Sequence, residues 1–376
     1  MKKEKIGNIL QMQRGYDLPS SQMNEGEIPV VGSNGIVGYH DVSRCIIPTI
    51  TIGRSGSAGK VHIYDTPTWV HNTALYLTDF KGNNPQYLYY LLQLLHLEKL
   101  CGSSVIPSLN RNVVYPMIVN FHEDRCEQDA IAYTLSLIDE KIALNREINR
   151  NLEAMARQLY DYWFVQFDFP DENGRPYKSS GGKMVWNEKL KREIPEYWSG
   201  GSMKDFLTIC NGKDHKDLDE GNYPVYGTGG LMRKVDAYLF EGESVLLPRK
   251  GSLSNYMYVN EAFWTVDTMF YTKERIKGAA KYIFLSLRYI DIARFDSGTG
   301  VPSMTSIAYY SIPFVYPTTK ILEAFNKRIT PLLKQIKKFE KQISVLCKQR
   351  DELLPLLMNG QVSVMPSEVN CDLSHD

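Results

Sequence analysis

The chain has 376 residues, which is too long for one ordinary core and indicates two or three domains. Its hydrophobic fraction of 43% and charged fraction of 23% are typical of a soluble globular protein, and no stretch of about 18 residues is apolar enough to span a membrane. Basic and acidic residues balance at 43 each, so any nucleic-acid-binding surface must come from local placement of charge.

The cysteines, histidines and first residues exclude several other classes. The six cysteines form no C-x-x-C pair and the seven histidines lack zinc-ligand spacing, so we expect reduced thiols and no metal. The N-terminal segment 1–15 is basic, but it has no long apolar stretch and no small-residue cleavage site. We therefore expect no signal peptide and a cytoplasmic location.

One unit occurs twice in the sequence, 195 residues apart. The segment PVVGSNGIVGYHD at 29–41 returns as PVYGTGGLMRKVD at 224–236. The same offset, without a gap, pairs Arg54 with Arg249, Gly56 with Gly251, Ser57 with Ser252, Trp69 with Trp264, Thr73 with Thr268, Tyr76 with Tyr271, Tyr87 with Tyr282, and Pro107-Ser108 with Pro302-Ser303. Because tryptophan is rare, a tryptophan pair in frame with the others indicates a duplication.

Each copy predicts a compact α/β unit made mostly of strands. Apolar and β-branched runs are separated by Gly, Pro, Asp and Asn, which is typical of short strands joined by turns. The predicted strands are 45–53, 60–64, 243–248, 256–259 and 263–266. One apolar helix in each copy, 84–100 and 277–295, is expected to pack on the sheet.

A long helix with a heptad pattern follows each copy. The seam positions are Ile131, Leu135, Ile138, Ile142, Asn145, Asn149, Leu152, Ala156, Leu159 and Trp163, then Phe325, Ile329, Leu332, Ile336, Phe339, Ile343, Leu346, Arg350, Leu353 and Leu357. The second seam is apolar except at Arg350, and the first has asparagines at two positions. Each helix would be roughly 50 to 60 Å long. The pattern alone is equally consistent with self-association or core packing, but the duplication favours antiparallel pairing of the two helices, with the copies at opposite ends and the two asparagines fixing the register.

Three polar loops recur at matching positions, and the first is GSNG at 32–35 with GTGG at 227–230. A tight turn that needs positive φ would explain its glycines. The alternative is a loop that brings Ser33, Asn34 or Thr228 to a nucleic-acid backbone or base edge.

The second loop is GRSGSAGK at 53–60 with PRKGSLSN at 248–255, and it does not satisfy the phosphate-binding pattern G-x-x-x-x-G-K-[ST]. Arginine, hydroxyls and loop amides suit phosphate or guanine, although a solvated arginine in a salt bridge is equally compatible. The candidate residues are Arg54, Ser55, Ser57, Lys60, Arg249, Lys250 and Ser252.

The third loop is CGSSVIPSLNRN at 101–112 with SGTGVPSMTS at 297–306. Such loops are usually plain solvent-exposed turns, but base-reading side chains would also have to lie here. The candidates are Ser108, Arg111, Thr299 and Ser303. We expect the paired residues Trp69, Trp264, Tyr87 and Tyr282 to be core aromatics rather than stacking platforms.

No catalytic motif is present in the sequence. It has no [DNS]-P-P-[YF] tetrapeptide, no ATP-binding loop, and no Ser/His/Asp or Cys/His set repeated between the halves. We therefore expect a chain without catalytic residues.

The layout and motifs resemble the specificity subunits of type I restriction-modification enzymes over nearly the whole chain. The resemblance rests on the paired loop motifs, on VIPSL and VPSM, and above all on QLYDYWFVQFDFP at 158–170 followed by IPEYW at 194–198. One departure is DELLPLLMNGQVSV, which stands where the second copy would repeat LYDYWFVQFDFP.

The resemblance implies binding of double-stranded DNA at a bipartite site, one domain per half-site. It also implies recruitment of two methylation subunits and of restriction and translocation subunits, with no membrane. S-adenosylmethionine, ATP and Mg would be bound by those partners, and this chain would bind no cofactor. The alternative is a coiled-coil scaffold whose duplicated domains bind proteins rather than DNA.

We therefore predict an α+β protein with two tandem α/β target-recognition domains, each followed by a long helix, the helices forming an antiparallel coiled coil. The predicted segments are domain 1 at 1–122, helix 1 at 123–166, a surface linker at 167–202, domain 2 at 203–317, helix 2 at 318–360 and a flexible tail at 361–376.

Overall fold

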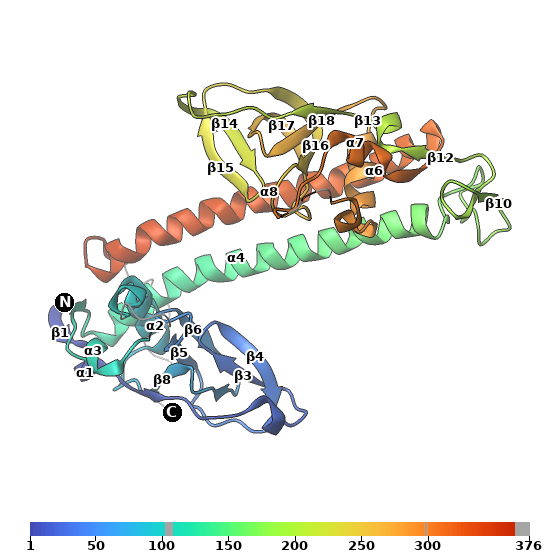
Figure 1. The fold of residues 1–376 in the computed structure, drawn as a ribbon. Coiled ribbons are helices and arrows are strands. Elements are labelled where there is room, and N and C mark those ends of the chain that lie inside the picture. The colour runs from blue at the N-terminus through green and yellow to red at the C-terminus, as the bar shows by residue number, and fades with distance from the viewer. Residues whose placement is uncertain (102–107, 297, 299, 365–376) are drawn as a thin grey trace. The chain divides into compact units, whose positions relative to one another are not determined.

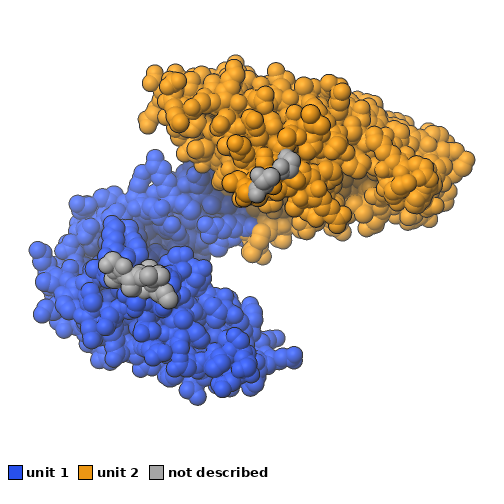
Figure 2. Space-filling view, in the orientation of Figure 1, with its two compact units in different colours: residues 1–146, 340–376 blue, residues 147–339 orange. Residues whose placement is uncertain are grey.

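The structure is a computed structural model that describes residues 1–101, 108–296, 298 and 300–364. It divides into two compact units, shown in separate colours in Figure 2. Unit 1 holds residues 1–146 and the described residues from 340 onward, and unit 2 holds residues 147–339. Each unit therefore contains one globular copy and a part of both long helices (Figure 1).

The globular part of unit 1 consists of three small sheets and short helices. Their strand orders are β2-β8-β5-β6, β4-β3-β7 and β1-β9. The strands are β1 (Lys2–Lys5), β2 (Gln11–Arg14), β3 (Ile28–Gly32), β4 (Gly35–His40), β5 (Thr49–Gly53), β6 (Val61–Tyr64), β7 (Trp69–Val70), β8 (Ala74–Asp79) and β9 (Ile118–Phe121). The α-helices are α1 (Ile6–Ile9), α2 (Pro85–Leu94) and α3 (Arg111–Val114), with 3-10 turns at Ser20–Gln22 and Leu97–Leu100.

Unit 2 repeats this plan. Its main sheet has the order β13-β18-β16-β17-β14-β15, and β12 pairs with β19. The strands are β12 (Ser199–Ser202), β13 (Leu207–Asn211), β14 (Glu220–Gly227), β15 (Gly230–Val235), β16 (Phe240–Pro248), β17 (Met257–Thr265), β18 (Met269–Glu274) and β19 (Pro313–Tyr316). The helices are α5 (Met203–Phe206), α6 (Ala279–Ser286) and α7 (Ser306–Ser311), with 3-10 turns at Leu287–Tyr289 and Ile292–Phe295.

The two copies differ in one strand. In unit 2, β17 pairs antiparallel with β16 along its length and parallel with β14 at its end, where Val225 faces Trp264. In unit 1 the same roles fall to two short strands, β6 beside β5 and β7 beside β3, where Val30 faces Trp69. The runs 256–259 and 263–266, predicted as separate strands, are thus one strand.

The apolar helix of each copy is shorter than the sequence predicts. The first ends at Leu94 because His96 adopts a left-handed conformation at φ 48°, which an α-helix cannot continue through. The second ends at Ser286, and extended backbone at Ile290 and Asp291 separates the following 3-10 turns. Tyr87 and Tyr282 nevertheless lie fully in the core, as predicted.

The long helices are α4 (Arg125–Tyr160, 36 residues) and α8 (Thr319–Met358, 40 residues), about 54 and 60 Å long at 1.5 Å per residue. Their pairing is antiparallel in each unit. In unit 1, Asn145 Nδ2 donates to Gln342 Oε1 at 3.4 Å, and Arg350 Nη1 donates to Asp139 Oδ1 at 3.0 Å. In unit 2, the rings of Trp163 and Phe325 lie 5.7 Å apart.

Each domain core is completed by the end of the helix that follows the other copy. Leu354, Leu357 and Met358 of α8 join the core of unit 1. A π-helical turn at Asp161–Val165 extends α4, and its Trp163 and Phe164 join the core of unit 2. The departure noted in the sequence therefore replaces an aromatic contact with an aliphatic one.

The segment 167–202 is not a surface linker, contrary to the prediction. Phe167, Phe169 and Trp198 are buried in the core of unit 2, and Phe169 stacks on Trp198 with ring centroids 4.7 Å apart. Residues 171–193 are exposed or half-buried and include β10 (Met184–Asn187) and the first half of β11 (Arg192–Pro195), whereas Ile194 in β11 is buried in the same core. The burial of these aromatic residues was not predicted, because most of the segment consists of proline, glycine and charged residues that are typical of loops.

We expect Trp163→Ala to lower the free energy of unfolding by about 3–5 kcal/mol, because it removes a large buried ring. The matched control is Trp186→Ala on β10, whose side chain is 57% exposed and for which a change within about 0.5 kcal/mol is expected. Urea unfolding followed by circular dichroism measures both. Equal losses in the two variants would contradict this account of the core.

Candidate nucleic-acid interface

The first predicted loop is the two-residue turn of a hairpin in both copies. Ser33-Asn34 joins β3 to β4, and Thr228-Gly229 joins β14 to β15. The glycine that ends each turn has positive φ, 109° at Gly35 and 104° at Gly230, so the predicted explanation holds for these two glycines but not for Gly32, Gly227 and Gly229, whose φ is not positive. The turns place the Ser33 and Thr228 hydroxyls beside the second loop.

Backbone hydrogen bonds fix the second loop in the same way in both copies. The amide of Arg54 donates to the carbonyl of Thr73 at 2.8 Å, and the amide of Arg249 donates to that of Thr268 at 2.8 Å. The next glycines, Gly56 and Gly251, have φ of 84° and 90°. At each of them a built Cβ would lie 3.8 Å from the hydroxyl oxygen of Ser33 or Thr228, so the first two loops are neighbours.

The third loop is attached to the second by equivalent bonds. Leu109 N donates to Arg54 O at 2.8 Å, and Met304 N donates to Arg249 O at 2.9 Å. Bridges also link Ser55 with Ser108 and Lys250 with Ser303. The structure thus brings the three predicted loops together in each unit, while Thr299 and residues 102–107 lie outside the described part.

A side-chain link joins the second loop to the hairpin turn in both copies, but its chemistry differs. In unit 1, Lys60 Nζ donates to Asn34 Oδ1 at 2.7 Å. In unit 2, Asn255 occupies the equivalent position, and its Nδ2 donates to the Thr228 carbonyl at 2.8 Å. The backbone frame is therefore the same, while the exposed groups differ between the copies.

The candidate arginines are held to different degrees. Arg54 is half-buried and donates weakly from Nη1 to the Asn72 carbonyl at 3.4 Å. Arg249 is exposed, with its guanidinium carbon 5.8 Å from the Phe270 ring centroid. Arg111 begins α3, and its Nη1 donates to the Met12 carbonyl at 3.2 Å. Arg249 has the freest guanidinium of the three.

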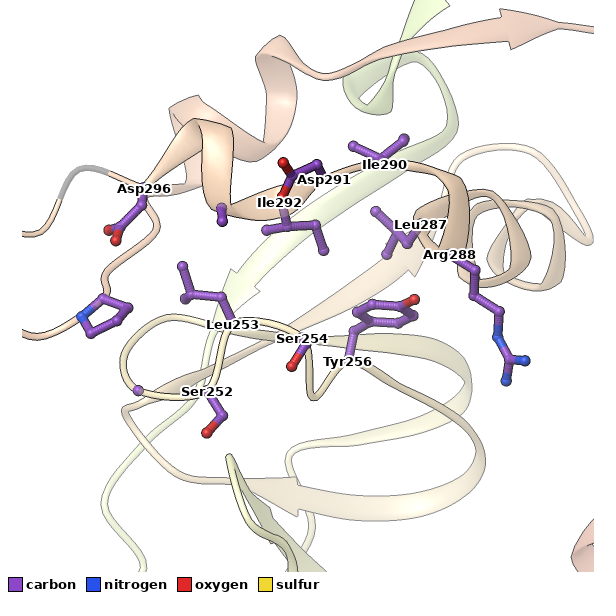
Figure 3. Close-up of a pocket in the computed structure, with 13 residues that line it drawn as sticks. Ser252, Leu253, Ser254, Tyr256, Leu287, Arg288, Ile290, Asp291, Ile292 and Asp296 are labelled. Atoms are coloured by element: carbon purple, nitrogen blue, oxygen red, sulfur yellow. The ribbon is translucent and has the colours of Figure 1, made fainter. Parts of the chain in front are cut away.

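A cleft of about 480 Å³ adjoins the second loop of unit 2 (Figure 3). Leu253 and Tyr256 of the loop side face Leu287 and Ile292, while Arg288 extends away from the cleft. At one end, Asp296 accepts hydrogen bonds from the amides of Ser303 and Gly298, each at 2.8 Å. These amide bonds hold the pKa of Asp296 below its usual value, so this carboxylate braces the third loop in its charged form.

Of the paired tryptophans, Trp69 lies in the domain core as predicted, whereas Trp264 packs against its core but is only partly buried. Trp69 is buried, with the Arg44 guanidinium carbon 4.7 Å from its ring centroid, and the half-buried Trp264 donates from Nε1 to the Lys213 carbonyl at 2.9 Å. The prediction did not include Thr73 and Thr268, whose carbonyls anchor the arginine loops. Their signal was present as a matched pair at the repeat offset.

A comparison with protein families decides which kind of protein carries these loops. The family described as type I restriction modification DNA specificity domain matches residues 1–154 and again residues 195–346. The chain belongs to this family. The two matches cover both globular copies and most of both long helices, so the family domain occurs twice in tandem.

Relatives named as type I specificity subunits align over nearly the whole chain. The type I restriction enzyme MjaIX specificity subunit of Methanocaldococcus jannaschii is 24% identical, over 93% of this chain and 91% of its own length. A putative type I specificity subunit of Mycoplasma genitalium is 25% identical, over 91% of each chain. The crystal structure of a type I restriction-modification S subunit from M. genitalium has the same fold, with a TM-score of 0.71, 20% identity, and coverage of 95% of this chain and 96% of that one.

Two further observations concern features outside the loops. Among the described residues, no helix is both long and apolar enough to cross a membrane, and no three His, Cys, Asp or Glu side chains gather as metal ligands. Of the described cysteines, Cys45, Cys101, Cys210 and Cys347 are free thiols.

We expect Arg54→Ala and Arg249→Ala each to weaken specific DNA binding, by about 1–3 kcal/mol if the arginine contacts a base edge. Folding should be preserved, since both loops are fixed by backbone bonds. Binding by fluorescence anisotropy at constant salt measures the effect. Arg175→Ala is the control, because Arg175 is exposed and pairs with Asp171 at 3.2 Å in the hairpin region. Unchanged affinity in both folded variants would remove these arginines from the interface.

Proposed function

We propose that this chain reads DNA for a type I restriction-modification enzyme, with each domain binding one half of a bipartite site. The observation that carries the proposal is that three polar loops are bonded together in each unit, and that an arginine occupies the equivalent backbone position in both units. Two similar reading surfaces on one chain suit two half-sites that differ in sequence.

The chemistry of the loops suits duplex DNA. Arginine can donate to phosphate oxygens or to guanine O6 and N7, and hydroxyls and free loop amides can donate to phosphates. The net charge of zero requires that this attraction be local. Arg249, Lys250 and Ser252 are exposed together on one loop, which supplies such a local positive surface in unit 2.

The proposal assigns no chemical step to the chain itself. Methylation and cleavage would be carried out by methylation subunits, two per chain, and by restriction and translocation subunits. Those partners would bind S-adenosylmethionine, ATP and Mg, and the complex would work in the cytoplasm, where the host DNA lies.

A second candidate is a scaffold whose duplicated domains hold two protein partners. The balanced net charge favours it. A retardation assay with the chain, alone and with its methylation subunits, on random and on methylation-target duplexes separates the two. DNA reading predicts a complex whose affinity falls steeply as salt rises, because phosphate contacts release counterions. If neither the chain alone nor the chain with its methylation subunits binds DNA, the DNA-reading proposal is wrong and the scaffold is supported.

The paired helices would set the distance between the half-sites. On each long helix, the insertion point lies between the residues of the pairs Asp139–Arg350 and Asn145–Gln342. One heptad inserted after Ile142 in α4 and another after Leu346 in α8 therefore lengthen both helices equally, and both pairs can still form. The double insertion lengthens the helix pair by about 10 Å. The preferred number of base pairs between the two half-sites should therefore grow by around three, with both half-site sequences unchanged.

Selection from duplexes with randomised spacer length measures this change. A heptad inserted in one helix alone is the control, and it should destabilise the protein because it breaks the antiparallel register. An unchanged spacer in a well-folded double insertion would show that the helices do not set the distance.

A further inference from the structure

A β-bulge lies next to the hairpin turn in unit 1. Val31 pairs with Ile36 and Val30 pairs with Gly38, so the register of β3 and β4 skips Val37. A bulge of this kind places two residues opposite one and redirects the extra side chain.

The same bulge occurs in unit 2. Tyr226 pairs with Leu231 and Val225 pairs with Arg233, so the register of β14 and β15 skips Met232. Val37 and Met232 are 195 residues apart, as are the other equivalent positions of the repeat. The irregularity is therefore a shared feature of the two domains.

Both bulges present aliphatic side chains to solvent. In unit 1, Ile36 is 51% and Val37 56% exposed, and in unit 2, Leu231 is 59% and Met232 56% exposed. Single exposed apolar residues are ordinary on a protein surface. An adjacent pair, at the same bulge in two domains whose other loop residues have diverged, indicates a use for apolar surface.

A glycine on the opposite strand makes room for the bulged residue. A Cβ built on Gly32 would lie 3.0 Å from Val37 Cγ1, and one built on Gly227 would lie 2.6 Å from Met232 Sδ. A larger residue at either glycine would displace that side chain. The glycines before the turns are therefore explained by packing, since only the glycines after the turns have positive φ.

The bulged residue lies beside the polar loops. In unit 2, Met232 lines a cleft of about 420 Å³ together with Thr228 and Gly229 of the turn and Asp267 and Thr268, and the Thr268 carbonyl anchors Arg249. In unit 1, the hydroxyl of Thr73, the equivalent of Thr268, would lie 3.1 Å from a Cβ on Gly32. In both units the aliphatic pair thus adjoins the proposed DNA surface.

We propose that each hairpin enters the major groove and that Ile36-Val37 and Leu231-Met232 contact the 5-methyl groups of thymines, one or more in each half-site. This inference rests on the proposed function. The major groove is wide enough for a two-stranded β-ribbon, and the thymine methyl is the apolar group that base edges present there. Aliphatic side chains cannot hydrogen-bond to the other groups on those edges, so the methyl is the partner that suits them.

Uracil replaces thymine without its methyl group and keeps the pairing, so it isolates this contact. The full chain, with its methylation subunits, is bound to its selected site, and the thymines of one half-site at a time are replaced by deoxyuridine. We expect about a fourfold loss of affinity for each methyl that is contacted, since burying a group of that size contributes this much.

Two variants assign the contact to the hairpins. Ile36→Ser combined with Val37→Ser should remove the uracil sensitivity of one half-site, and Leu231→Ser combined with Met232→Ser should remove that of the other, so each double variant is a control for its partner. Ile118→Ser on β9, where the side chain is 63% exposed, should behave as the parent chain does.

The outcomes separate this inference from the proposed function. If the complex selects no DNA sequence, the proposed function fails. If it selects a site but uracil has no effect, if the variants keep the parent's uracil sensitivity, or if a half-site contains no A·T pair, specific DNA reading stands and the methyl contact is wrong.

Discussion

The structure depends on the antiparallel pairing of α4 and α8. Because each helix starts beside one domain and ends in the core of the other unit, neither core is complete without both helices. The polar centre of the pairing in unit 1 is Asp139, which accepts from Arg350 at 3.0 Å and from the Tyr90 hydroxyl of α2 at 2.8 Å. Arg350, the residue that interrupts the apolar seam, is therefore paired, and one carboxylate connects a domain helix to both long helices. Removing one partner of such a contact would leave the others poorly satisfied.

The sequence was sufficient for the architecture because its strongest signals are periodic. The repeat offset and the two heptad seams predicted two similar domains and two antiparallel helices, and the family match and the structure agree. The predictions failed where the local composition of a segment differs from its packing in the folded protein. Phe167, Phe169 and Trp198 are buried in a segment whose glycines, prolines and charges are typical of a loop. His96 stops a helix that hydrophobicity alone would continue, since periodicity carries no information on a single left-handed residue.

The candidate site was predictable as three loops but not as one surface. Matching residues identified Arg54 and Arg249, whereas their meeting with the third loop depends on backbone bonds between distant segments, which side-chain patterns do not encode. The bulges at Val37 and Met232 could not be predicted from the sequence either, because a shift of one residue in strand register does not change the residue composition. The DNA role of the individual loop residues stays a prediction.

The bonds that hold these loops have a consequence for how such a protein can change. Each anchor, from Arg54 to Thr73 and from Leu109 to Arg54, joins main-chain atoms, and so do the equivalent anchors of unit 2. Most substitutions leave such bonds intact, so exposed side chains on the loops are free to vary by mutation while the scaffold persists. Asn34 and Lys60 against Gly229 and Asn255 are one such divergence within a single chain. New sequence preferences can therefore evolve one residue at a time, without an unfolded intermediate in the lineage.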